Sequence, residues 1–180
     1  LGELATEKLY SLTDNGHLTA ESSYQIKNNA YSFGCTFVEV EVDIPGCKAQ
    51  VTDILNVHDC GCLINPALAE AQVHGGMSMA IGYALSEKML YDERTGKPLN
   101  NNLLDYKLST FMDHPDLHAA FIENYEPTSA YGTKALGEPP TCSPAPAIRN
   151  AILQATGVAL NEIPMRPHLL FEKFTEAGLL

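Results

Sequence analysis

The segment from Asn65 to about Ser86 is the longest periodic stretch of the sequence and restricts the fold most. Asn65 can cap the free amide groups at a helix start, and Pro66 has the backbone angle of a first helical position. The apolar residues that follow recur at helical spacing, at Val73, Met77, Ala80, Ile81, Ala84 and Leu85. The sequence therefore predicts one helix whose apolar stripe faces a core.

Two alternating segments before this helix predict a sheet. Apolar and polar residues alternate from Phe33 to Val42, which is the period of a half-buried strand. Pro45-Gly46 then marks a turn, and a second apolar run extends from Ala49 to Val57. We expect the two strands to pair as an antiparallel hairpin.

The rest of the chain contains short elements separated by turns. We expect helices over 4–12, 145–156 and 167–177, and strands over 88–91 and 119–125. Residues 126–146 hold five of the eleven prolines and two glycines, so we expect a long shaped loop there. No strand–helix unit repeats. The fold class is therefore α+β, with mixed or antiparallel strands and several helices, rather than a doubly wound sheet.

Charge and composition exclude several classes of protein. The 180 residues include 22 acidic and 11 basic side chains, giving a net charge of −11, and the basic residues are scattered. A nucleic-acid partner is not expected, since phosphates are held by clustered Lys and Arg. A membrane span is not expected either, because no apolar run approaches roughly 18 residues. The five cysteines, an odd number, do not suggest a disulfide framework, so we expect a reducing, cytoplasmic location.

Two adjacent glycines in the predicted long helix require an explanation. Gly75 and Gly76 should each cost about 1 kcal/mol of helix stability relative to alanine. They lie on one side of the helix with Gln72, Met79 and Tyr83, where the small centre lets another backbone or a flat ligand come close. Packing of a second helix over the glycines is one interpretation. Ligand contact is the other, because the Gln72 amide is both a donor and an acceptor.

Glu138 has the most specific local setting among the acidic residues. It follows Gly137, which permits unusual backbone angles, and precedes Pro139, which should force Glu138 toward an extended conformation. Its neighbours are apolar, so desolvation should make the carboxylate more basic and suit it to proton abstraction. The alternative is a surface or helix-capping glutamate beside a rigid turn.

Metal ligation is not predicted, although two segments contain candidate ligands. His58-Asp-Cys60-Gly-Cys62 has a Cys-x-Cys spacing, and no second pair with ordinary zinc spacing follows. His114 and His118 are four residues apart, but Pro115 between them favours a surface turn. Buried thiols usually behave as small apolar groups, so we name no metal-ligating residue.

A set of motifs in fixed order relates the sequence to a known family. They are Asp59-Cys-Gly61, Leu63-Ile-Asn65-Pro66, Gln72-Val-His-Gly75-Gly76, Gly82-Tyr-Ala-Leu85, Leu104-Asp-Tyr-Lys107 and Lys134-Ala-Leu-Gly-Glu-Pro-Pro140. From about Phe33 to its end, the chain resembles the carboxyl-terminal part of the molybdenum-binding subunit of the xanthine dehydrogenase family of molybdenum hydroxylases. Bacterial xanthine dehydrogenase-type subunits are the nearest match. Cys62 departs from the common pattern.

The resemblance implies roles for four residues. Glu138 matches the family's catalytic glutamate, which takes the proton from a hydroxyl on molybdenum so that the oxygen can attack an electron-poor carbon. Gln72 matches the glutamine that hydrogen-bonds the pterin cofactor, and Gly75 and Gly76 let the helix approach it. No protein residue binds the metal, because the dithiolene of the cofactor holds it.

The resemblance also implies the reaction. A purine such as hypoxanthine or xanthine would be oxidatively hydroxylated with water as the oxygen source, through a molybdenum–molybdopterin cofactor that bacterial members often carry in a cytosine dinucleotide form. An aldehyde or other N-heterocycle hydroxylase, and a noncatalytic scaffold domain, are the alternatives.

The resemblance further implies a larger assembly. FAD and iron–sulfur clusters would lie on partner domains or subunits, and the rest of the molybdenum subunit and a small-molecule substrate would be the other partners. We expect residues 1–180 to be a carboxyl-terminal fragment and one lobe of the cofactor-binding domain, with 1–32 as a lead-in. The assembly should be an oligomer, and the isolated chain should be inactive.

Overall fold

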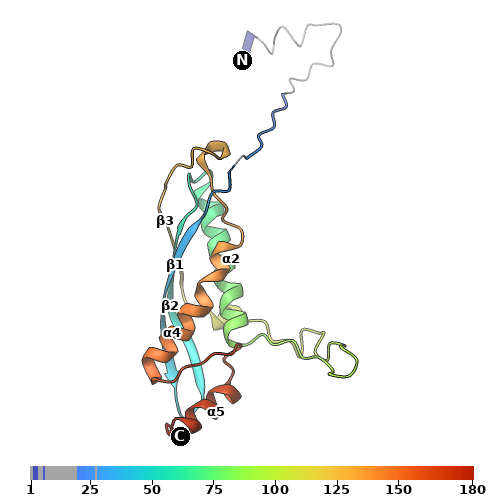
Figure 1. Ribbon diagram of the computed structural model, residues 1–180, viewed down its shortest axis with the longest axis vertical. Coiled ribbons are helices and arrows are strands. Elements are labelled where there is room, and N and C mark those ends of the chain that lie inside the picture. Colours follow the sequence, from blue (N-terminus) through green and yellow to red (C-terminus); the bar gives the residue numbers. More distant parts are fainter. Residues whose placement is uncertain (1, 4–5, 7–19, 27) are drawn as a thin grey trace.

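A computed structural model describes residues 2–3, 6, 20–26 and 28–180 of the chain. The helix expected over residues 4–12 falls outside the described residues. Figure 1 shows an elongated body in which the strands run beside two long helices, with a looped arm leaving the body at one side. Within the described part of the chain, no helix is both long enough and apolar enough to cross a membrane.

The expected hairpin is confirmed. Strands β1 (Phe33–Asp43) and β2 (Lys48–Asp59) pair antiparallel along almost their whole length. The turn between them is fixed by Asp43, whose Oδ1 accepts a hydrogen bond of 3.0 Å from the backbone N–H of Gly46. The register shifts between Glu39 and Val40, which marks a bulge. On one face of the hairpin most residues of β2 are buried and those of β1 are mostly half-buried, while the residues of the other face are mostly exposed.

The long helix, α2 (Pro66–Leu85), also forms as the sequence predicts. Asn65 caps it, since its Oδ1 accepts a hydrogen bond of 3.1 Å from the backbone N–H of Leu68. At the other end the backbone N–H of Ser86 donates to the carbonyl of Gly82. The cap and the proline thus set the start of the helix where local sequence placed it.

A third strand, β3 (Leu117–Phe121), pairs parallel to β2 and completes a sheet of order β1-β2-β3. The mixed sheet with its helices confirms the α+β class. The strand expected over 119–125 begins and ends earlier, at Leu117 and Phe121. It pairs with Ile54–His58, and because β2 ends one residue later, at Asp59, β3 has no partner strand beyond this point. The ladder closes where the N–H of Ile122 donates to the carbonyl of His58.

The strand expected over 88–91 is wrong, because only one isolated bridge, between Tyr91 and Pro98, forms there. The side chain of Asn100 takes up the neighbouring backbone groups instead. Its Oδ1 accepts from the N–H of Leu90 and its Nδ2 donates to the carbonyl of Lys88, each at 2.7 Å. This segment forms the arm in Figure 1.

The expectation of a loop through 126–146 is partly wrong. A short helix, α3 (Pro139–Cys142), lies inside it, and α4 (Pro144–Thr156) begins one residue earlier than expected. Each helix has proline in its first turn, where no N–H is needed, so these prolines start helices rather than break them. The last helix, α5 (Pro167–Glu176), matches the sequence prediction to within one residue.

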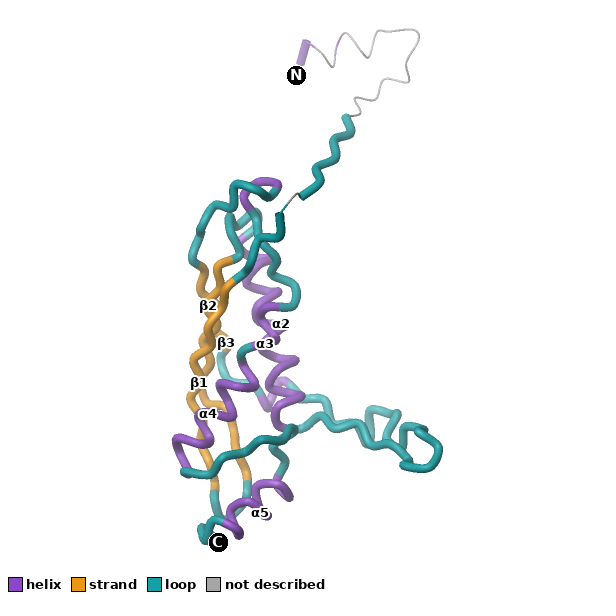
Figure 2. Tube along the Cα trace, in the orientation of Figure 1, coloured by secondary structure: helices purple, strands orange, loops and turns teal. Residues whose placement is uncertain are grey.

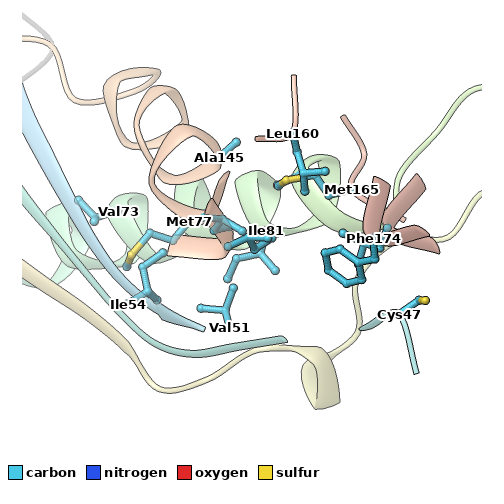
Figure 3. Close-up of a cluster of buried hydrophobic side chains, with 14 residues drawn as sticks. Cys47, Val51, Ile54, Val73, Met77, Ile81, Ala145, Leu160, Met165 and Phe174 are labelled. Atoms are coloured by element: carbon cyan, nitrogen blue, oxygen red, sulfur yellow. The ribbon is translucent and has the colours of Figure 1, made fainter. Parts of the chain in front are cut away.

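The core lies between the sheet and the helices. Helix α4 packs on β1, and α2 packs on β2 and β3 (Figure 2). Figure 3 shows Val51 and Ile54 of the sheet together with Met77 and Ile81 of α2 in the same cluster, where all are at most 2% exposed. The predicted apolar stripe of α2 is thus buried, apart from the half-buried Leu85.

His58 is an unusual member of this interior. Its side chain is 1% exposed, and neither ring nitrogen has a hydrogen-bond partner among the described residues. The ring lies over Gly34 of the neighbouring strand, where an added Cβ would approach Cε1 to 2.6 Å. Burial lowers the pKa of His58 below its ordinary 6.5, because the charged ring would lose its hydration.

This burial predicts acid sensitivity. Above about pH 6.5 the ring is neutral in both the folded and the unfolded state, so its protonation costs no stability. Below that pH the unfolded chain binds a proton that the folded chain resists, and the free energy of unfolding should fall by up to about 1.4 kcal/mol per pH unit. Denaturant unfolding between pH 7.5 and 5.5 measures this slope. His58→Met should flatten it, and an equal slope in both proteins would contradict the prediction.

Candidate functional site

The structure brings together two site residues that are far apart in the sequence. The Nε2 of Gln72, on α2, donates a hydrogen bond of 3.0 Å to the carbonyl oxygen of Gly137, the residue before Glu138. The predicted cofactor-binding glutamine therefore lies beside the predicted catalytic glutamate. Both side chains are exposed in this chain.

Side chains of the body hold the segment around Glu138 by its carbonyl groups. The Nδ2 of Asn56, on β2, donates to the carbonyl of Pro140 at 3.2 Å, and Asn56 is fully buried. The hydroxyl of Tyr83, on α2, donates to the carbonyl of Thr141 at 2.5 Å. Together with the bond from Gln72, these donors fix the loop from the strand side and from the helix side.

The backbone of Glu138 differs from the expected extended conformation. Its φ of −92° and ψ of −32° are helical, and it is the residue before the first turn of α3, where its side chain makes no capping hydrogen bond. The carbonyl of Glu138 accepts hydrogen bonds from the backbone N–H and the hydroxyl of Thr141, at 2.9 and 2.8 Å. These two bonds outweigh the preference that a following proline imposes, so a helical turn sets the backbone position from which the carboxylate projects.

Glu138 is also exposed, so the expected apolar burial of its carboxylate is wrong for the chain by itself. It lies on the wall of an open concavity of about 560 Å³, which Gly34 of β1 also lines. Cys142 and Ser143 complete this wall on the α3 side. A ligand placed in the concavity would meet the carboxylate directly.

Of the two interpretations of the glycines in α2, close packing applies to Gly76 and an open approach to the helix applies to Gly75. A Cβ added at Gly76 would approach the Cβ of Pro140 to 2.5 Å, so Gly76 lets α2 pack closely on α3. A Cβ added at Gly75 would meet nothing within 4 Å, and Gly75 is exposed. Close packing of the protein explains Gly76, whereas Gly75 keeps a bare stretch of backbone open beside Gln72.

An ion pair that the sequence did not predict supports the same loop. The Nζ of Lys134 lies 2.7 Å from Oδ2 of Asp59, and their side chains are 4% and 14% exposed. The hydrogen bond from Lys134 is the largest cause that lowers the pKa of Asp59, and the N–H of Gly61 also donates to this carboxylate. The pair joins the end of β2 to the segment that leads into Glu138.

Backbone bonds reinforce this junction. The N–H of Lys134 donates to the carbonyl of Cys60 at 2.7 Å, and the N–H of Cys62 donates to that of Gly132 at 2.9 Å. Gly61 has a φ of 73°, and a Cβ there would collide with the carbonyl of Gly132. The Asp-x-Gly spacing was the sequence signal that could have predicted this junction, since aspartate forms the ion pair and glycine adopts the positive φ.

The arrangement is suited to binding and proton transfer. It provides an exposed carboxylate, an amide group and an open stretch of helix backbone, all on one side of the body. In the described part of the chain, no three His, Cys, Asp or Glu side chains gather to hold a metal ion.

Comparison with known proteins gives the chain its relatives. A family model described as a molybdopterin cofactor-binding domain matches residues 1–115. The chain is 53% identical over its whole length to the xanthine dehydrogenase molybdenum-binding subunit of Escherichia coli O157:H7, of which it covers 24%. It is 31% identical, over 93% of its length, to the aldehyde oxidoreductase molybdenum-binding subunit of Escherichia coli K12, again covering 24% of that protein.

A solved structure agrees with these sequence matches. Quinoline 2-oxidoreductase from Pseudomonas putida 86 superposes with a TM-score of 0.71 and 34% identity, over 76% of this chain and 18% of that one. The chain thus spans about a quarter of the length of the curated relatives it matches.

Removing one partner of the buried ion pair should destabilise the protein strongly. Lys134→Met leaves the Asp59 carboxylate buried without its cation, and we expect a loss of about 3–5 kcal/mol in the free energy of unfolding. The exposed Lys97 offers a control, since Lys97→Met should change it by less than about 0.5 kcal/mol. Denaturant titration of the three proteins measures both values, and equal effects of the two substitutions would show that the ion pair carries no special weight.

Proposed function

Because the chain belongs to the family of molybdopterin cofactor-binding domains, we propose that it forms one wall of the active site of a molybdenum hydroxylase. The observation that best supports this proposal is the hydrogen bond from Gln72 to Gly137, which brings the Gln72 amide beside Glu138. We propose that the amide binds the cofactor and that Glu138 accepts the proton. In this proposal residues 1–180 are the carboxyl-terminal part of the molybdenum-binding subunit.

The residues of the site fit a molybdopterin cofactor. The bond to Gly137 uses one of the hydrogen-bonding positions of the Gln72 amide, and the others can serve a pterin that carries both donors and acceptors. Gly75 leaves room for a flat group to approach the helix backbone, because a Cβ there would point into open space. The bound cofactor would supply the metal centre that accepts the two electrons of the oxidation.

Glu138 acts as the general base in this proposal. Its carboxylate oxygen accepts the proton of the water-derived oxygen that attacks the electron-poor carbon of the substrate. The helical turn of α3 fixes the backbone of Glu138, so the carboxylate projects from a defined position on the wall of the concavity. A positioned general base typically contributes about 10²–10⁴ in rate.

A purine such as hypoxanthine or xanthine is the proposed substrate. The relative at 53% identity is named for xanthine, whereas the one at 31% is named for aldehydes. An aldehyde or another N-heterocycle is the second candidate, supported by that weaker relative and by the quinoline enzyme. We further propose a cytosine dinucleotide form of the cofactor, and partner subunits with FAD and iron–sulfur clusters that pass the electrons on.

The two glycines provide a matched test of the cofactor-facing helix. Gly75→Ala should raise the free energy of unfolding by about 0.5–1 kcal/mol, since alanine favours a helix and meets no neighbour. In the full-length subunit the same methyl group should lower the molybdopterin content, because it occupies the space that the cofactor needs. Gly76→Ala should instead lower the stability, by pressing on Pro140. Calorimetry and cofactor assay separate the effects, and a normal cofactor content in Gly75→Ala would remove Gly75 from the cofactor contact.

Glu138→Gln tests the catalytic role. The amide keeps the size of the side chain but cannot accept the proton, so turnover of xanthine or hypoxanthine by the assembled enzyme should fall by about 10²–10⁴. Molybdenum content and thermal unfolding should stay unchanged, because Glu138 holds the loop through its backbone carbonyl. Glu93→Gln, at an exposed position on the arm, should leave turnover intact. Full activity in Glu138→Gln would favour a noncatalytic role for this glutamate.

A further inference from the structure

The sheet has an outer face that its own helices do not cover. Ile54, Asn56 and His58 of β2 point toward α2 and α4, so their sequence neighbours point the opposite way. On that opposite face Phe33 and Phe37 of β1 are 65% and 59% exposed. Figure 3 shows Val51 and Ile54 turned from the strands toward the helices.

The outer face has two chemically different halves. The apolar half contains Phe33, Cys35 and Phe37 of β1, Leu55 and Val57 of β2, and Ala120 of β3, all connected by cross-strand pairing. The acidic half contains Glu39, Glu41, Asp43 and Asp53, which continue the same strands. The three strands contain one lysine, Lys48, which lies opposite Asp43, and no arginine. The Nε2 of His118 lies 3.5 Å from Oδ1 of Asp53.

Such a face is unlike the solvent side of an isolated sheet. The sheet is mixed, with β1 and β2 antiparallel and β2 and β3 parallel, so its pairing alone does not decide whether one face or both are covered. An antiparallel sheet that faces water alternates apolar and polar residues, and the apolar half here breaks that pattern on its outward positions. A cluster of exposed apolar side chains next to a polar rim marks an interaction surface.

We propose that this outer face packs against the rest of the molybdenum-binding subunit. The matching surface has an apolar patch opposite Phe33, Phe37 and Leu55 and carries Lys or Arg side chains opposite the acidic half. The inference rests on the proposed function, because that function makes this chain a part of the larger subunit. It adds the face through which the two parts join.

Charge complementarity and chain length favour this occupant over a second copy of the chain. An interface between identical copies must be self-complementary, and the acidic half would find one lysine per copy to pair with. The relatives are about four times as long as this chain, so most of the polypeptide is available to form the covering layer. Covalent linkage keeps that layer at a high effective concentration.

Cys35 gives a direct readout, because its thiol lies in the apolar half and is exposed in this chain. In the native full-length subunit, purified without partner subunits, maleimide should label Cys35 at least about 100-fold more slowly than in the unfolded subunit. Peptide mapping by mass spectrometry identifies the labelled cysteine. Rapid labelling of Cys35 in the native subunit would overturn the proposal.

Two matched variants test the same face. Phe37→Asp places a charge in the apolar half and should accelerate labelling of Cys35 about tenfold or more, since one buried carboxylate costs several kcal/mol. Phe171, on α5, is 58% exposed compared with 59% for Phe37, and Phe171→Asp should leave Cys35 protected. Equal protection of Cys35 in both variants would show that the apolar half is not a packed interface.

The other occupants give distinguishable results. If Cys35 is protected only at high protein concentration, a second copy covers the face and the proposal is wrong. If it is protected only after the iron–sulfur or FAD subunits are added, one of them is the occupant and the proposal is again wrong. Labelling does not depend on turnover, so failure of the catalytic role of Glu138 would leave this result unaffected.

Discussion

The position of the candidate base depends on hydrogen bonds to backbone carbonyl groups. Prolines 139 and 140 begin α3, and because this helix has only four residues it makes few backbone hydrogen bonds of its own. Gln72, Asn56 and Tyr83 supply side-chain donors to three carbonyls in α3 or just before it. Each donor lies in α2 or β2, so the short helix α3 and the residue before Glu138 are held by the elements of the core.

Helix α2 serves the core, the loop and the open side with different faces. Val73, Met77 and Ile81 are buried against the sheet, whereas Gly76 packs on Pro140 of the loop. Gly75 remains bare on a third face. A helix with apolar residues on several sides is covered by other parts of the protein on several sides. A change in how α2 packs on the sheet would therefore also move the loop that carries Glu138.

Local signals in the sequence predicted the helices and strands well, but they did not predict the contacts between distant segments. The Asn65-Pro66 start of α2 and the β1–β2 hairpin depend on neighbouring residues, and both formed as expected. The hydrogen bond from Gln72 to the carbonyl of Gly137 joins residues 65 apart in the sequence, and the buried ion pair of Asp59 with Lys134 joins residues 75 apart. Such contacts leave no periodicity in the chain, and only the motifs indicated that the segments belong together.

The outer face and the candidate site are linked through the first residues of β1. Gly34 lines the concavity that contains Glu138, while its neighbours Phe33 and Cys35 point to the opposite side of the sheet. β1 is an edge strand, so among the described strands only β2 pairs with it. Its position otherwise depends on what packs on its two faces. A layer over the apolar half would clamp this end of β1, and with it one wall of the concavity. Assembly of the subunit and the geometry of its active site would then be set by the same strand.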